Sequence, residues 1–244
     1  LSRRAAKAAI DGRNVWVNRK CVWIARYALQ TGDLVEIPTV VVKGAQRQGA
    51  TADRAGGATA RPSAAPAARR HVRVLWSDAN YLVCDKPAGL VSCDDPKSAE
   101  AILRAQENVP TLEAVHRLDR DTTGCLLFAK SHAAFLAAVE VFKTHKVSKI
   151  YHAIVVGRFP YAHQVIDAPL DGQPAVSRVA REGASADASF LRVRIETGRT
   201  NQIRRHLASV RFPIVGDRVF GLKRARDARL LQVPRQMLHA STLT

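Results

Sequence analysis

The chain has 244 residues, 47% of them hydrophobic, which is enough for one medium-sized domain and one small domain. Its 38 basic and 21 acidic residues leave a formal net charge of +17, which suits a polyanionic partner because neutralised phosphates release counterions. The four cysteines form no Cys-x-x-Cys pair, which argues against zinc, and no apolar run approaches the length of a membrane-spanning helix.

Residues 1–42 are predicted to form one small unit. A helix-forming run, Ala5–Ala9, follows a serine that is a candidate N-cap. Alternating apolar residues predict strands at 14–17 and 34–37, with a tight basic turn at 18–20 after the first strand. We therefore expect a small αβ domain here.

Residues 43–70 are rich in alanine, glycine, arginine, proline and threonine, and they contain no bulky apolar residue. Such a segment cannot bury enough apolar surface to offset the entropy lost on ordering. We expect a flexible basic linker between the small unit and the rest of the chain.

Residues 71–244 are predicted to form the larger domain. The predicted strands cover residues 72–76, 81–85, 125–129, 150–156 and 190–196, and the predicted helices cover 98–106, 131–145 and 202–210. Strands and helices do not alternate regularly, as they would around a parallel sheet, so the fold class is predicted to be α+β.

The segment His116–Gly124, HRLDRDTTG, places one carboxylate, Asp119, on a turn directly before the apolar run at 125–129. A carboxylate beside a core strand is held rigidly, as a catalytic group must be. Taken alone, the segment is better explained as a turn whose aspartates cap the local backbone. A second carboxylate, Asp121, is too close in sequence to converge with Asp119 on one substrate in the manner of a glycosidase.

Five further segments decide between these interpretations by their order. They are Tyr81–Leu90 (YLVCDKPAGL), Lys149–Gly157 (KIYHAIVVG), Gly198–Leu207 (GRTNQIRRHL), Pro213–Gly221 (PIVGDRVFG) and Leu238–Ala240 (LHA). Together with HRLDRDTTG, they resemble the large-ribosomal-subunit-type (RluA-like) family of RNA pseudouridine synthases over about Val72–Leu243. The chain departs from the family pattern at Thr123, usually a serine, and at Asn201, usually a histidine.

The resemblance implies the pseudouridine synthase fold, which is a bent, largely antiparallel mixed sheet with a central cleft. It also implies three catalytic residues. Asp119 would attack C1′ of the ribose or remove its 2′ proton, and the sequence does not decide between the two. Arg204 would keep Asp119 ionised, with a guanidinium fork suited to both carboxylate oxygens; Arg205 is the adjacent alternative. Tyr151 would stack on the displaced uracil, and its hydroxyl could assist proton removal at C5.

Other residues near these segments have less specific roles. By resemblance, Arg117 would hold the flipped nucleotide or take its place in the RNA. Lys86 and Arg199 lie in predicted loops and are candidate contacts to phosphates, although a loop lysine is as often merely solvated. Asp217 is interpreted as a structural acceptor in its turn. The histidines of the GRTNQIRRHL and LHA segments are expected to pack or to bond locally.

The first unit resembles the S4 RNA-binding module in part, over roughly Ser2–Ile37. The resemblance rests on an SR dipeptide before a helix, a strand ending in Val-Asn, and the segment GDLVEI. It implies that basic residues of this unit contact RNA, and the candidates are Arg3, Arg4, Arg19 and Lys20.

The sequence therefore predicts an RNA pseudouridine synthase that isomerises a specific uridine in structured RNA, with large-subunit ribosomal RNA as the expected partner. The alternative is a ribosome-assembly factor or RNA chaperone that binds precursor rRNA without catalysis. The reaction needs no redox change, energy source or metal, so we expect no cofactor and no metal ion. Members of the resembled family continue past the LHA segment, so we expect further residues after Thr244. We expect an intracellular protein, with the mitochondrial matrix preferred over a bacterial cytoplasm.

Overall fold

The computed structural model describes residues 15–17, 20–21, 30–36, 71–144, 146–221 and 228–244. The chain divides into two compact units, Leu1–Ala65 and Pro66–Thr244. The predicted linker at 43–70 and the predicted N-terminal helix both lie outside the described residues, so both stay predictions.

The first unit contains a small antiparallel sheet. Its strands are β1 (Trp16–Val17), β2 (Lys20–Cys21) and β3 (Val35–Glu36), in the order β2–β1–β3. Strands β1 and β3 fall where alternation predicts them, and Val17 is 2% exposed. The likeness to the S4 module stays a prediction, because most of this unit lies outside the described residues.

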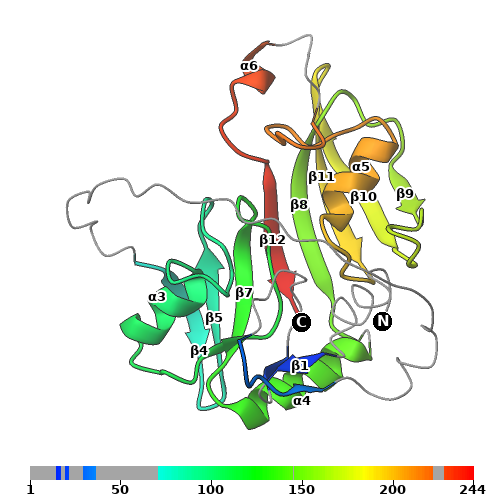
Figure 1. Ribbon diagram of the computed structural model, residues 1–244. Coiled ribbons are helices and arrows are strands. Elements are labelled where there is room, and N and C mark those ends of the chain that lie inside the picture. Colours follow the sequence, from blue (N-terminus) through cyan, green and yellow to red (C-terminus); the bar gives the residue numbers. More distant parts are fainter. Residues whose placement is uncertain (1–14, 18–19, 22–29, 37–70, 145, 222–227) are drawn as a thin grey trace. The chain divides into compact units, whose positions relative to one another are not determined.

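The second unit contains a nine-stranded sheet and four described helices (Figure 1). The strands are β4 (Arg73–Ser77), β5 (Tyr81–Lys86), β6 (Glu113–Ala114), β7 (Thr123–Ala129), β8 (Lys149–Val156), β9 (His163–Ile166), β10 (Ser177–Ala184), β11 (Ala188–Ile195) and β12 (Leu238–Leu243). The helices are α3 (Ala99–Gln106), α4 (His132–Lys143), α5 (Gln202–Ser209) and α6 (Ala228–Leu231).

The strand order is β4–β5–β7–β12–β8–β11–β10–β9, and β6 pairs with β7 beside this path. Every neighbouring pair is antiparallel except β7 and β12, which run parallel. The sheet is therefore mixed and mostly antiparallel, and the predicted α+β class is confirmed. Alternation missed the short strands β6 and β9 and the more polar β10 and β12.

Strand β12 joins the two halves of the sheet by lying between β7 and β8 (Figure 1). Its Ala240 is opposite Gly124 on β7 and Tyr151 on β8. A side chain at Gly124 is impossible, because a Cβ there would lie 2.1 Å from the Ala240 carbonyl oxygen and φ is +109°. The glycine that ends HRLDRDTTG thus lets the LHA strand approach closely, which sets the turn of Asp119 near Tyr151.

The helices predicted at 98–106 and 131–145 begin one residue later, at Ala99 and His132. Ser98 and Ser131 are N-caps, and their hydroxyl oxygens accept hydrogen bonds from the amides of Ala101 and Ala134. Helix α4 ends at Lys143, two residues earlier than predicted. Its buried face, which includes Phe135, packs against β7 and β6, and this packing fixes the half of the sheet that carries the HRLDRDTTG turn.

Candidate active site

Asp119 lies on a turn that is fixed on both sides. The Thr122 amide donates to the Asp119 carbonyl at 3.1 Å, and β7 begins one residue later. On the N-terminal side, the buried Ser92 hydroxyl both donates to the Leu118 carbonyl and accepts from the Leu118 amide, each at 2.9 Å. The Asp119 side chain is 30% exposed, so a rigid backbone presents its carboxylate to solvent.

Lys86 holds the other side of this turn, and the prediction that it contacts RNA is wrong. It is the last residue of β5 rather than a loop residue, and it is fully buried. Its Nζ donates to the carbonyl oxygens of Pro87, Leu90 and Arg120 at 2.9, 2.7 and 2.9 Å. Burial lowers the pKa of Lys86 to about 8. The ammonium ties the β5 end to the residue that follows Asp119, so its role is structural.

Arg204 reaches Asp119 from the first turn of α5. Its Nη1 donates to Oδ2 of Asp119 at 3.0 Å, a normal hydrogen-bond distance. The same nitrogen donates to the side-chain oxygen of Asn201 at 2.7 Å. Asn201 occupies the N-cap position without a side-chain capping bond, and its φ of 54° is a left-handed conformation that asparagine tolerates better than most residues. The residue that replaces the family's usual histidine therefore contacts the arginine itself.

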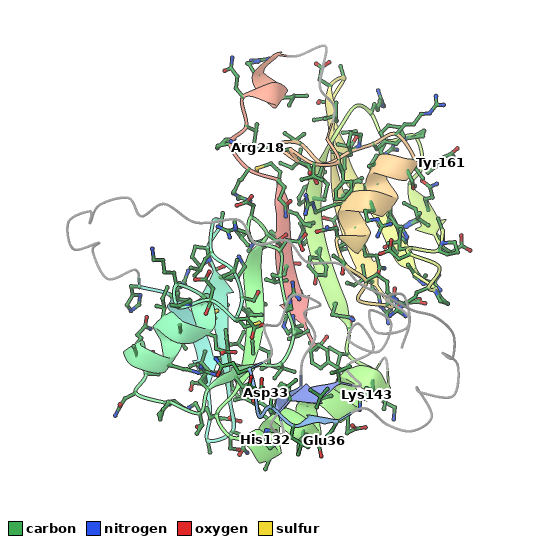
Figure 2. The ribbon with its side chains drawn as sticks, viewed as in Figure 1. Asp33, Glu36, His132, Lys143, Tyr161 and Arg218 are labelled. Atoms are coloured by element: carbon green, nitrogen blue, oxygen red, sulfur yellow. The ribbon has the colours of Figure 1, made fainter. Side chains whose placement is uncertain are left out.

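The guanidinium fork of Arg204 grips Asp217, not Asp119, which corrects the predicted geometry. Nε and Nη2 of Arg204 donate to the two Asp217 oxygens at 2.7 and 3.0 Å. The Asp217 side chain is fully buried, and its Oδ1 also accepts from the amides of Val219 and Phe220 at 2.9 and 3.0 Å. Only one Arg204 nitrogen is left to Asp119. Asp217 lies in the Pro213–Gly221 segment, whose place is marked by the label of its neighbour Arg218 in Figure 2.

The electrostatics of this group favour full ionisation. Burial alone would raise the pKa of Asp217, but hydrogen bonds from Arg204 and from two backbone amides lower it. Burial alone would lower the pKa of Arg204, but the carboxylates of Asp217 and Asp119 raise it. The Phe220 ring centroid lies 5.0 Å from the guanidinium carbon, which adds a cation–π contact. Arg204 is therefore a fixed positive charge beside Asp119.

Tyr151 comes to the same place from β8. The residue is 8% exposed and lines a pocket of about 90 Å³ together with Asp119 and Arg204. Burial raises its pKa, and the negative charge of Asp119 raises it further, so the hydroxyl is neutral. Among the residues that the structure describes, no hydrogen-bond partner faces this hydroxyl. A buried hydroxyl without a protein partner is available to a bound molecule.

Arg117 and Arg199, both predicted to contact RNA, also line this pocket. Arg117 is exposed, and Arg199 donates from Nε to the Pro174 carbonyl at 3.0 Å. The predicted contacts of the first unit stay predictions. Arg3, Arg4 and Arg19 lie outside the described residues, and the structure describes the backbone of Lys20, in β2, but not its side chain.

The histidines of the GRTNQIRRHL and LHA segments make hydrogen bonds to neighbouring groups, as expected. The buried His206 contacts the Ser177 hydroxyl through Nδ1 at 2.9 Å and the Ala168 carbonyl through Nε2 at 3.0 Å. His239 contacts the Thr123 hydroxyl at 2.9 Å. Within the described part of the chain, no group of three or more histidine, cysteine or acidic residues is placed to hold a metal ion. None of the helices described is long and apolar enough to span a membrane.

A mixed, mostly antiparallel sheet with a carboxylate, an arginine and a tyrosine around one pocket at its centre defines the class of α+β proteins with the pseudouridine synthase fold. A solved structure, the human RNA pseudouridylate synthase domain containing 1, has the same fold: the TM-score is 0.62 at 24% identity, over 73% of this chain and 80% of that one.

Sequence comparison narrows the class to a family. Residues 80–209 match the model of the RNA pseudouridylate synthase family. The ribosomal large subunit pseudouridine synthase C of Vibrio cholerae is 30% identical over 94% of this chain and 76% of its own length. The ribosomal large subunit pseudouridine synthase D of Pseudomonas aeruginosa is 36% identical over 70% of this chain and 63% of its own length. The chain belongs to the RNA pseudouridylate synthase family, although it spans less than two thirds of the length of several curated relatives that it matches.

Proposed function

We propose that this chain is an RNA pseudouridine synthase, and that Asp119, Tyr151 and Arg204 carry the reaction. One observation supports this most strongly: an accessible carboxylate lies 3.0 Å from a buried arginine, in a pocket that also contains a buried tyrosine hydroxyl. The residues come from a turn, a strand and a helix that are far apart in sequence. The arrangement suits cleavage of the N1–C1′ bond and rejoining through C5, which needs no external reactant.

Each residue has a distinct part in this proposal. The Asp119 carboxylate acts on the ribose, either as a nucleophile at C1′ or as a base at the 2′ position. Arg204 keeps that carboxylate charged and oriented, because its own position is set by Asp217. The Tyr151 ring stacks on the freed uracil, and its neutral hydroxyl is placed to relay the C5 proton. Arg117 and Arg199 bind phosphates at the pocket mouth.

We further propose large-subunit ribosomal RNA as the substrate. Two relatives bear the name ribosomal large subunit pseudouridine synthase, and the net charge of +17 suits a polyanion. Mapping pseudouridine in cellular RNA with and without the gene tests this proposal. We expect one or more uridines in large-subunit rRNA to lose the modification, and to regain it with the wild-type gene. Loss confined to transfer or messenger RNA would contradict the assigned substrate.

The same strains test the alternative, a factor that binds precursor rRNA without catalysis. A gene carrying Asp119→Asn removes the proposed catalytic charge with little change in shape. We expect it to fail to restore the modification. If it restores ribosome assembly nonetheless, then scaffolding is the essential role and catalysis is dispensable.

We propose that the first unit and the segment after it anchor the RNA. Residues 1–70 contain 13 basic and 4 acidic residues, a net charge of +9. Deleting them is expected to weaken RNA binding and to flatten the dependence of log affinity on log salt by about 0.7–0.9 for each phosphate that the chain no longer binds. An unchanged slope would mean that these basic residues are only solvated.

A further inference from the structure

The sheet of the second unit has a face that the proposed reaction does not use. Side chains alternate along a strand, so neighbours point to opposite faces. Ser177 of β10 contacts the side chains of Gln202 and His206 on α5, the helix that lies over β10 in Figure 1. Arg178 therefore points to the opposite side. In the same way, Ile195 of β11 lines the catalytic pocket, and Arg194 points away from it.

A groove of about 340 Å³ lies on this opposite face, over β9, β10 and β11. Four basic side chains line it: His163, Arg178, Arg192 and Arg194. The register sets Arg178 directly opposite Arg194, and both are exposed. Like charges directly opposite each other destabilise a sheet, and a bound anion would relieve that repulsion. The groove therefore has the character of an anion site.

Two carboxylates partly balance the arginines. Glu196 pairs with Arg178, and Glu182 pairs with Arg192 at 2.9 Å. The arginine side chains of these pairs are 53% and 49% exposed. Exposed ion pairs contribute little to stability, so an incoming phosphate can exchange with the carboxylates at small cost. Arg194 has no ion-pair partner among the residues that the structure describes, which leaves an excess of positive charge.

An aromatic pair, of which Phe190 is exposed and His152 half-buried, continues the same face. Phe190 precedes Arg192 by two residues on β11 and is 42% exposed. Its ring stacks on that of His152 of β8, with centroids 5.1 Å apart and an interplanar angle of 13°. From Phe190 to Arg194 the strand rises about 13 Å, at ~3.3 Å per residue. An aromatic ring and a row of arginines on an open sheet are the two elements that bind single-stranded RNA: bases stack, and arginines contact phosphates.

We infer that this face is a second RNA-binding site, for a single-stranded segment, on the side of the sheet opposite the catalytic pocket. The phosphates would lie between Arg178, Arg192 and Arg194, and one base would stack on Phe190. The choice of RNA over another anion rests on the proposed function. The site itself rests on the groove, its charge and the exposed aromatic ring. It would bind substrate RNA at a distance from the uridine that reacts.

The test uses a fluorescein-labelled 12-nucleotide oligocytidylate, whose binding is measured by anisotropy from low to high salt. This probe contains no uridine, so its binding is independent of the isomerisation. The first variant carries Arg178→Gln with Arg194→Gln. The matched control carries Arg73→Gln with Lys97→Gln, which changes the charge equally at two exposed positions elsewhere on the unit. A third variant, Phe190→Ala, removes the stacking ring.

The double arginine variant is expected to lower the slope of log affinity against log salt by about 1.4, at ~0.7 per single-stranded phosphate contact. Phe190→Ala is expected to weaken binding by about 5- to 150-fold, the usual range for one stacked base. The control should match the wild type. A slope for the double arginine variant equal to that of the control would overturn the inference.

A second outcome would also overturn the inference. In it, the wild type binds an oligoglutamate peptide, and the double arginine variant loses this binding but binds RNA as the wild type does. That result would point to an acidic protein partner. Failure of the second RNA-binding site can be distinguished from failure of the proposed catalytic function. A chain that forms no pseudouridine but shows the expected slope change would refute the catalytic proposal and leave the second site standing. A chain that forms pseudouridine but shows no slope change would refute the second site and leave the catalytic proposal standing.

Discussion

Asp217→Asn tests whether a buried carboxylate fixes the arginine of the active site. The substitution keeps the shape and retains one acceptor oxygen for the amides of Val219 and Phe220. It replaces the second oxygen with an NH₂ group that faces the Nε–H of Arg204, whose nitrogen in the wild type lies 2.7 Å from a carboxylate oxygen. Two donors then meet at a fully buried side chain, and the buried guanidinium loses half of its countercharge.

The expected cost follows from the burial. Removing one partner of a buried ion pair typically destabilises a protein by about 3–5 kcal/mol. Arg204 keeps its contacts to Asp119 and Asn201, so we expect the lower end, about 3 kcal/mol, measured as the free energy of unfolding in urea. Turnover should fall as well, because the arginine that orients Asp119 is no longer fixed.

The chain offers a matched control on the same helix. Arg205 makes an equivalent two-point contact with Asp171, at 3.1 Å for each nitrogen, but those side chains are 27% and 49% exposed. Asp171→Asn should therefore cost less than about 1 kcal/mol. Equal losses of stability for Asp217→Asn and Asp171→Asn would refute the reasoning, which attributes the larger loss to the burial of the Asp217–Arg204 pair.

Three further predictions follow from the same geometry. Lys86→Met removes the donor from three carbonyl oxygens, of which that of Leu90 is buried, so the free energy of unfolding should fall by about 1–3 kcal/mol; a stable variant with weaker RNA binding would restore Lys86 as an RNA contact. Tyr151→Phe keeps the ring and removes the hydroxyl, so RNA affinity and stability should be unchanged while single-turnover rates fall by about 10²–10⁴-fold; a rate equal to that of the wild type would limit Tyr151 to stacking. The pKa of Asp217 is lower in the folded than in the unfolded chain, so its stabilising contribution is complete above about pH 4 and is lost as the pH falls through the folded pKa. The stability difference between wild type and Asp217→Asn should accordingly shrink below about pH 4 in urea titrations, and a constant difference would contradict the assigned pKa shift.

The sequence could predict those features of the site that lie within short segments. HRLDRDTTG places Asp119 on a turn before a core strand, and the predicted starts of α3 and α4 lie within one residue of the observed ones. The meeting of Asp119 with Arg204, 85 residues later, was predicted only through the resemblance to a family. The periodicity of apolar residues does not predict a contact between residues so far apart in sequence.

The features of the site that were not predicted from the sequence depend on contacts between distant segments. The local sequence predicts a loop at Lys86, and only the fold shows that the carbonyl of Arg120, 34 residues away, accepts from it. Ser92 gives no local sign that it holds Leu118. Asp217 was assigned to its own turn, which is correct for the two backbone amides, but its main partner lies on α5. The sequence signal for this contact is the position of Asp217, 13 residues after Arg204, which was already assigned to the site.

Release of tritium from C5 of uridine tests the role of Asp119 most directly. Large-subunit rRNA transcribed with [5-³H]uridine is incubated with the wild-type chain, with Asp119→Asn, and with Asp121→Asn as a matched control two residues along the same turn. We expect the wild type and Asp121→Asn to release tritium at rates within about tenfold of each other, and Asp119→Asn to be slower by at least about 100-fold with RNA binding retained. Release by Asp119→Asn within about tenfold of the wild-type rate would contradict the assignment of Asp119 as the catalytic carboxylate.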